Sequence, residues 1–115
     1  MIPCILIDDE KKCLQTLELQ IKKHCPDLQV LATCDNAELG IEQIKLLKPE
    51  VVFLDIEMPK LNGFDMLERI GEIDFHVIFT TAYNQFAIKA FQFSALNYLL
   101  KPIDPDDLKE SMRRI

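Results

Sequence analysis

Carboxylate side chains directly follow two of the apolar runs in this sequence. Asp8 and Asp9 come after the run at residues 4–7, and Asp55 comes after the run at residues 51–54. Carboxylates that lie close together repel one another, and burying them without a partner costs free energy. A divalent cation removes this conflict, and a ligand set made only of oxygen atoms suits Mg²⁺ with its retained waters. The sequence therefore favours a magnesium site, provided that the two runs are neighbours in the fold.

Two other polar residues follow later apolar runs. Thr81 ends the run that includes residues 77–79, and Lys101 follows the run at residues 98–100. An aspartate beside a cation and a lysine is a poor general base but a capable nucleophile toward a phosphoryl group. Lys101 and the cation would neutralise the transferring oxygens, and Thr81 can donate a hydrogen bond to one of them. Each residue alone has an ordinary structural explanation, so it is their joint placement that indicates phosphoryl chemistry.

Short apolar runs alternate along the chain with amphipathic stretches. The runs lie at residues 4–7, 30–32, 51–54, 77–79 and 98–100, and the helical stretches lie near residues 14–21, 39–47, 66–70, 86–91 and 104–112. Continuous apolar runs are typical of parallel strands that are covered on both faces. Right-handed crossovers then give a five-stranded parallel sheet between two helical layers. The polar residues above all fall at the carboxyl edge of this sheet, where open α/β folds bind ligands.

Length and composition narrow the class of protein. The chain has 115 residues, which is typical of one domain, and its hydrophobic share of 49% is that of a folded protein. It carries 19 acidic against 13 basic residues, a net charge of −6, which argues against direct contact with nucleic acid. We find no apolar run of about 20 residues and no signal peptide, so we expect a cytoplasmic protein without membrane contact.

The four cysteines show no metal-binding spacing. Cys4 and Cys34 fall in two runs that could be neighbouring strands, which makes a disulfide between them conceivable. We instead expect four reduced and largely buried thiols, as in a reducing compartment.

Four stretches resemble, in order and in spacing, the receiver domain of two-component response regulators. They are ILIDDE at 5–10, FLDIEMPKLNG at 53–63, TTA at 80–82 and YLLKP at 98–102. The resemblance spans residues 3 to about 113. It implies a flavodoxin-like (CheY-like), doubly wound α/β fold of the (βα)5 type, with a five-stranded parallel sheet in the order 2-1-3-4-5 and one receiver domain over residues 1–115.

The resemblance also implies an acceptor and a metal site. Asp55 would accept a phosphoryl group from the phosphohistidine of a sensor histidine kinase. Mg²⁺ would be bound by Asp9 through its carboxylate, by Asp8 directly or through a water, by Asp55, and by the backbone carbonyl of Glu57. Such a domain is not a conventional enzyme, because it catalyses only its own phosphorylation and dephosphorylation.

The remaining roles concern how the phosphoryl group is held and sensed. By the same resemblance, Thr81 and Lys101 contact the phosphoryl group, and Tyr98 is an aromatic switch residue. The Lys101–Pro102 peptide bond is expected to be cis. On phosphorylation, the surface made by the fourth helix, fifth strand and fifth helix would change. A homodimer through this surface is one expected form of contact.

The stretches at 81–91 and 95–103 resemble more narrowly the receivers of the LytTR (LytR/AlgR) class. That class continues into a DNA-binding domain, so we expect transcription regulation through a LytTR output domain that is absent from this chain. Phe86, Phe91 and Phe93 cannot all point inward from one short helix. We expect one or two of them in the core and consider an exposed partner-binding position for another.

Two other functions compete with a phosphorylated switch. A haloacid-dehalogenase-like phosphatase also uses an aspartate nucleophile, Mg²⁺, a threonine and a lysine. That class requires a second aspartate two residues after the nucleophile, where this chain has Glu57, and a cap domain for which 115 residues leave no room. A receiver-like binding module without phosphotransfer is the second alternative, and the full set of polar residues argues against it.

Overall fold

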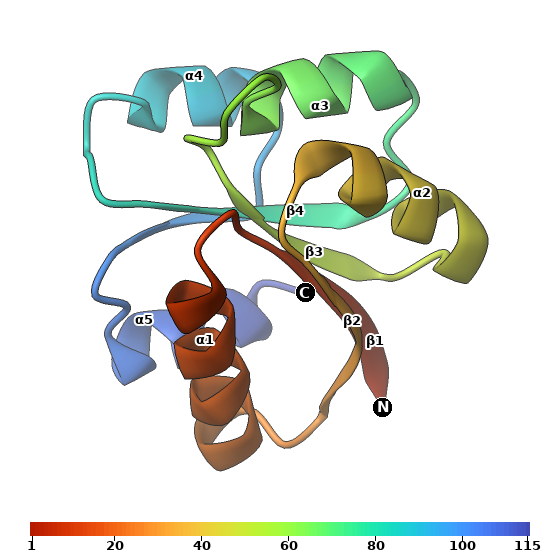
Figure 1. The fold of residues 1–115 in the computed structure, drawn as a ribbon. Coiled ribbons are helices and arrows are strands. Elements are labelled where there is room, and N and C mark those ends of the chain that lie inside the picture. The colour runs from red at the N-terminus through yellow and green to blue at the C-terminus, as the bar shows by residue number, and fades with distance from the viewer.

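The computed structural model describes residues 1–115 as five strands that alternate with five helices (Figure 1). The strands are β1 (Ile2–Ile7), β2 (Leu28–Cys34), β3 (Val51–Asp55), β4 (His76–Thr81) and β5 (Asn97–Leu100). The helices are α1 (Lys11–His24), α2 (Ala37–Leu47), α3 (Gly63–Ile70), α4 (Ala87–Gln92) and α5 (Pro105–Arg113). All strand pairs are parallel, and their order is β2-β1-β3-β4-β5, which confirms the predicted fold.

The sheet separates two apolar cores. Helices α2, α3 and α4 cover one face, and α1 and α5 cover the other (Figure 1). Neighbouring residues of a strand serve opposite cores, since Ile5 and Ile7 belong to the first and Cys4 and Leu6 to the second. Because both faces of the central strands are buried in an apolar core, these strands are continuous apolar runs in the sequence.

Strand β2 is longer than its predicted core at residues 30–32. It lies at the edge of the sheet, and its polar residues Gln29 and Thr33 are exposed. An edge strand that faces solvent alternates in polarity, so an apolar run marks only part of it. Helix α4, in contrast, has only six residues and begins just after Phe86.

Three helices begin at residues whose side chains accept a backbone hydrogen bond. Asn36 accepts from the N–H of Leu39, and Asn62 accepts from the N–H of Asp65. Asp104 accepts from the N–H of Asp106 at the start of α5. These caps satisfy donors that a helix leaves unpaired, and they fix where each loop at the carboxyl edge of the sheet ends.

All four cysteines are free thiols, as expected. Although β1 and β2 are neighbours, Cys4 lies opposite Val30 and Cys34 lies opposite Ile7, so the two thiols do not face each other. Burial raises the pKa of Cys4 to about 12 and that of Cys34 to about 11.

No helix has the length and apolar character that a bilayer crossing requires.

Candidate functional site

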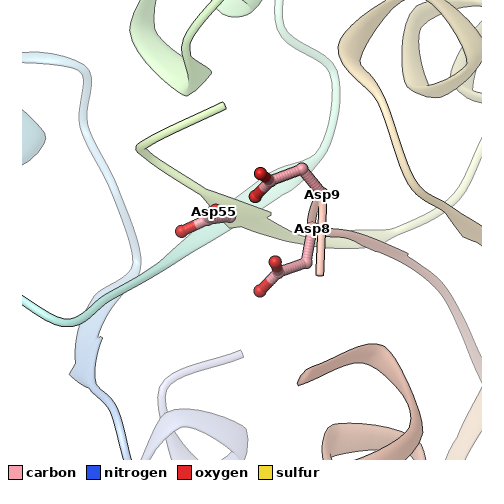
Figure 2. A group of neighbouring side chains, drawn as sticks. All are labelled: Asp8, Asp9 and Asp55. Carbon is pink, nitrogen blue, oxygen red and sulfur yellow. The ribbon is translucent and has the colours of Figure 1, made fainter. Parts of the chain in front are cut away.

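The carboxyl ends of β1 and β3 place three aspartates together. These two strands are hydrogen-bonded neighbours, with Ile7 opposite Leu54, so the residues that follow them meet at one edge. Asp8, Asp9 and Asp55 each offer a carboxylate oxygen, and these oxygens lie within 4.8 Å of one another (Figure 2). The expected convergence of the two acidic stretches is therefore present in the structure.

Lys101 completes this cluster from the end of β5. Its Nζ donates to Asp8 Oδ2 at 2.7 Å and to Asp55 Oδ1 at 3.3 Å. Burial alone would lower the pKa of Lys101, but the hydrogen bond to Asp8 and the charges of Asp55 and Asp8 hold its pKa above the usual range. The ammonium is therefore a fixed positive charge between two buried carboxylates.

The Asp55 carboxylate is under electrostatic stress. Burial and the charge of Asp8 raise the pKa of Asp55 to about 7, and Lys101 opposes this rise without cancelling it. Asp55 is 4% exposed, so little solvent is available to stabilise its negative charge. One ammonium is not enough for this cluster of carboxylates, and additional positive charge would favour the ionised form of Asp55.

The donor atoms at the cluster fit a hard divalent cation. All three side chains offer oxygen, and Asp9 reaches solvent, which leaves room for retained waters. Both oxygens of Asp8 already accept hydrogen bonds, Oδ1 from the Glu10 N–H at 2.9 Å and Oδ2 from Lys101. Asp9 and Asp55 are thus the freer ligands, and the residues present are suited to Mg²⁺.

Thr81 and Tyr98 meet at the loop that follows β4. The Thr81 side chain is buried, and its Oγ1 accepts from the Tyr83 N–H at 3.1 Å. The Tyr98 hydroxyl donates to the carbonyl oxygen of the same Tyr83. Burial raises the pKa of Tyr98. The backbone of Tyr83 therefore connects the side chain of Thr81, at the end of β4, to the side chain of Tyr98 in β5.

The rest of the edge is held by backbone contacts. The Lys101 N–H donates to the Thr81 carbonyl at 2.7 Å, which joins β5 to β4 beside the cluster. The Lys101–Pro102 peptide bond is cis. Glu57 follows Asp55 by two residues and its side chain is exposed.

Gly63 has a role that the sequence did not reveal. A Cβ atom at this position would lie 2.7 Å from the backbone oxygen of Asp55, so no side chain fits there. The Gly63 N–H donates to the Ile56 carbonyl at 2.8 Å. The first turn of α3 is therefore pressed against the backbone of Asp55. Asparagine–glycine pairs are typical of turns, but nothing in the pair indicates a contact with Asp55.

An aromatic cluster links α3 to α4. The ring of Phe64 has its centroid 4.9 Å from that of Phe79 and 5.2 Å from that of Phe93, and Lys89 Nζ lies 4.8 Å from the centroid of Phe64. Phe86 packs more loosely on the same ring, at 6.3 Å. Of the three phenylalanines in and beside α4, Phe86 and Phe93 pack against the core. The third, Phe91, is 62% exposed and faces outward.

Comparisons with known proteins agree with this geometry. The family described as "Response regulator receiver domain" matches residues 4–113. An uncharacterized response regulatory protein of Vibrio vulnificus is 39% identical over 116 residues, covering 100% of this chain and 48% of that protein. The transcriptional regulatory protein BtsR of Escherichia coli is 37% identical over 119 residues, covering 100% and 48%. The crystal structure of a LuxR-family DNA-binding response regulator from Staphylococcus aureus matches with a TM-score of 0.88 at 29% identity, covering 99% of this chain and 98% of that chain.

The fold and the family match together define the class of protein: a doubly wound receiver fold with an acidic cluster at the carboxyl edge of its sheet. The chain belongs to the response regulator receiver domain family and is thus a receiver of a two-component system. It spans about half the length of the curated relatives it matches.

Proposed function

We propose that this domain accepts a phosphoryl group from the phosphohistidine of a sensor histidine kinase onto Asp55. The observation that carries the proposal is the position of Lys101, whose ammonium bridges Asp55 and Asp8 within a cluster of three carboxylates. A nucleophilic carboxylate beside a fixed positive charge is the arrangement that phosphoryl transfer requires. The family match supports the same reaction.

In this reaction an Oδ atom of ionised Asp55 attacks phosphorus. The new O–P bond forms as the P–N bond to the kinase imidazole breaks, and the leaving nitrogen keeps the electron pair. Lys101 pairs with a phosphoryl oxygen, and the hydroxyl hydrogen of Thr81 is available to another, because Thr81 Oγ1 acts as an acceptor toward Tyr83. Mg²⁺ held by Asp8, Asp9, Asp55 and the Glu57 carbonyl would supply the remaining positive charge.

The signal would leave the site through Tyr83. Movement of Thr81 toward the phosphoryl group disturbs the Tyr83 N–H, and the Tyr83 carbonyl holds the hydroxyl of Tyr98. The surface made by α4, β5 and α5 would then shift between two states. Ile88 and Phe91 of α4 are 78% and 62% exposed, and Leu100 of β5 is also exposed, so this surface has the apolar character of a homodimer contact.

The output of the whole protein is part of the proposal. Because the chain covers 48% of relatives such as BtsR, which is called a transcriptional regulatory protein, we propose a receiver at residues 1–115 joined to a LytTR DNA-binding domain. The net charge of −6 on this segment assigns DNA contact to that other domain rather than to the receiver. The protein would act in the cytoplasm and would have no substrate other than its own Asp55.

The test is incubation with Mg²⁺ and phosphoramidate, followed by intact-mass measurement. The expected result is one added phosphoryl group in the wild type and none in Asp55→Asn, which keeps the size of the side chain but cannot form an acyl phosphate. Release of phosphate from a generic phosphate ester should remain at the level of the buffer control. A phosphorylated Asp55→Asn protein, or an unmodified wild type, would contradict the assignment.

A further inference from the structure

A cavity of about 380 Å³ separates α1 from the segment that follows β5. Its walls include Cys13, Leu17 and Gln20 of α1 on one side and Lys101, Pro102 and Ile103 on the other. Asp8 of the acidic cluster also lines this cavity. The segment that carries Lys101 is therefore not packed tightly against the helix it faces.

Lys101 must nevertheless be held in place for its ammonium to serve Asp55. Its own contacts are the Nζ bonds to Asp8 and Asp55 and the backbone bond to Thr81. Strand β5 ends at Leu100, so the bond from the Lys101 N–H to Thr81 is the last contact of this segment with the sheet, and α5 begins only at Pro105. Residues 101–104 thus bridge the gap between two regular elements, with a cavity beside them.

One side chain crosses this gap. Gln20 Nε2 donates to the carbonyl oxygen of Ile103 at 2.8 Å, a hydrogen bond between residues 83 positions apart. No other side chain of α1 forms a hydrogen bond with residues 101–104. The bond is partly buried, and it is the hydrogen bond that α1 makes with this segment. The bond therefore fixes the segment two residues after Lys101 at a set distance from α1.

We propose that Gln20 is a positioning residue for phosphoryl transfer, acting through the Ile103 carbonyl to hold Lys101 against Asp8 and Asp55. The inference rests on the proposed function of Asp55. Gln20 forms no hydrogen bond with the three aspartates, and its donor is bonded to the Ile103 carbonyl. Its effect is therefore on the position and direction of the Lys101 ammonium. Without the bond, the cavity gives residues 101–103 room to relax toward α1.

The test compares Gln20→Met with Gln15→Met. Methionine keeps the length of glutamine but removes its donor, and Gln15 is an exposed residue of the same helix with no side-chain hydrogen bond. We expect phosphorylation by phosphoramidate at saturating Mg²⁺ to be about 10-fold slower in Gln20→Met, because small displacements of catalytic groups have large effects on rate. Gln15→Met should match the wild type. The Mg²⁺ dissociation constant, measured by calorimetry, should stay within about twofold in both variants, since the three aspartates are untouched.

A third variant separates the hydrogen bond from packing. Gln20→Arg again offers an N–H donor, and the cavity has space for the longer side chain, so it should recover most of the lost rate. Equal rates for Gln20→Met and Gln15→Met would overturn the proposal, as would a Gln20→Arg protein as slow as Gln20→Met. A wild type that takes up no phosphoryl group would instead refute the function of Asp55 itself.

Discussion

Asp55 and helix α4 lie near the same edge of the sheet, but they are held in different ways. Asp55 ends a strand in which every residue is buried, with Gly63 pressed against its backbone and Lys101 bonded to its side chain. Helix α4 has six residues, of which only Ala90 is buried, and no side chain caps its start. The structure thus joins a rigid acidic cluster to a loosely held helix.

This difference fits the proposed function of each region. Charges that repel one another keep a fixed geometry only on firm supports, and two central strands supply such supports. A helix that shows Ile88 and Phe91 to solvent is attached mainly by aromatic packing on Phe64, which is easier to rearrange than a strand pairing. Segments that move in switching are drawn from the less stable parts of a fold. The four changes below test the contrast.

Lys101→Met should have the largest effect on stability. It leaves Asp8 and Asp55, both nearly fully buried, without a cation between them. Breaking a buried ion pair in this way costs about 3 kcal/mol. Urea denaturation at pH 8 in EDTA measures this loss, and the exposed Lys12→Met should stay within about 0.5 kcal/mol of the wild type. Equal losses in the two variants would mean that Lys101 does not support the cluster.

Asp55→Asn should stabilise the metal-free protein, and more so at high pH. Because the folded pKa of Asp55 is raised to about 7, the folded state binds the proton more tightly than the unfolded chain does. The resulting stabilisation is full below about pH 4 and is lost as the pH rises through about 7. The variant does not titrate, so its advantage over the wild type should grow by about 1 kcal/mol or more between pH 5 and pH 8. Urea denaturation at both pH values measures this difference in the free energy of unfolding. A difference that becomes smaller as the pH rises would contradict a raised pKa of Asp55.

Phe64→Leu should weaken α4 and leave the acidic cluster intact. The change removes ring contacts to Phe79 and Phe93 and the site under Lys89, at a cost of about 1 kcal/mol. Hydrogen exchange should become faster in α4 and stay slow in β1 and β3. Phe91→Leu, on the outer side of α4, is the matched control and should leave the exchange of α4 unchanged. Faster exchange throughout the sheet would show that α4 is not a separate, loosely held unit.

Phe91→Ser should have the smallest effect on folding and a selective effect on association. Phe91 is 62% exposed, so the free energy of unfolding should change by less than about 0.5 kcal/mol. Leu19→Ser on α1 is a control of similar exposure, at 67%. Sedimentation of the phosphorylated proteins should show weaker self-association for Phe91→Ser only. If both variants associate like the wild type, the α4 surface is not the dimer contact.

The two regions also differ in how well the sequence predicts them. Asp8, Asp55 and Lys101 each follow an apolar run, and parallel strands bring such residues to one edge whatever the details of packing. The contact of Gly63 with Asp55 and the bond from Gln20 to Ile103 depend on how distant segments pack, and no local pattern encodes them. The assignment of Phe91 to the surface, with Phe86 and Phe93 inside, likewise required the direction of α4 to be known.

The hydrogen bond between Tyr98 and Tyr83 has a spectroscopic consequence. The chain has no tryptophan, and these are its only two tyrosines. The phenol of Tyr98 therefore reports on the contact between β5 and the loop after β4, whereas the ring of Tyr83 is exposed to solvent. Tyrosine emission from the unlabelled protein comes from these two residues, and loss of the Tyr98 hydrogen bond should change it.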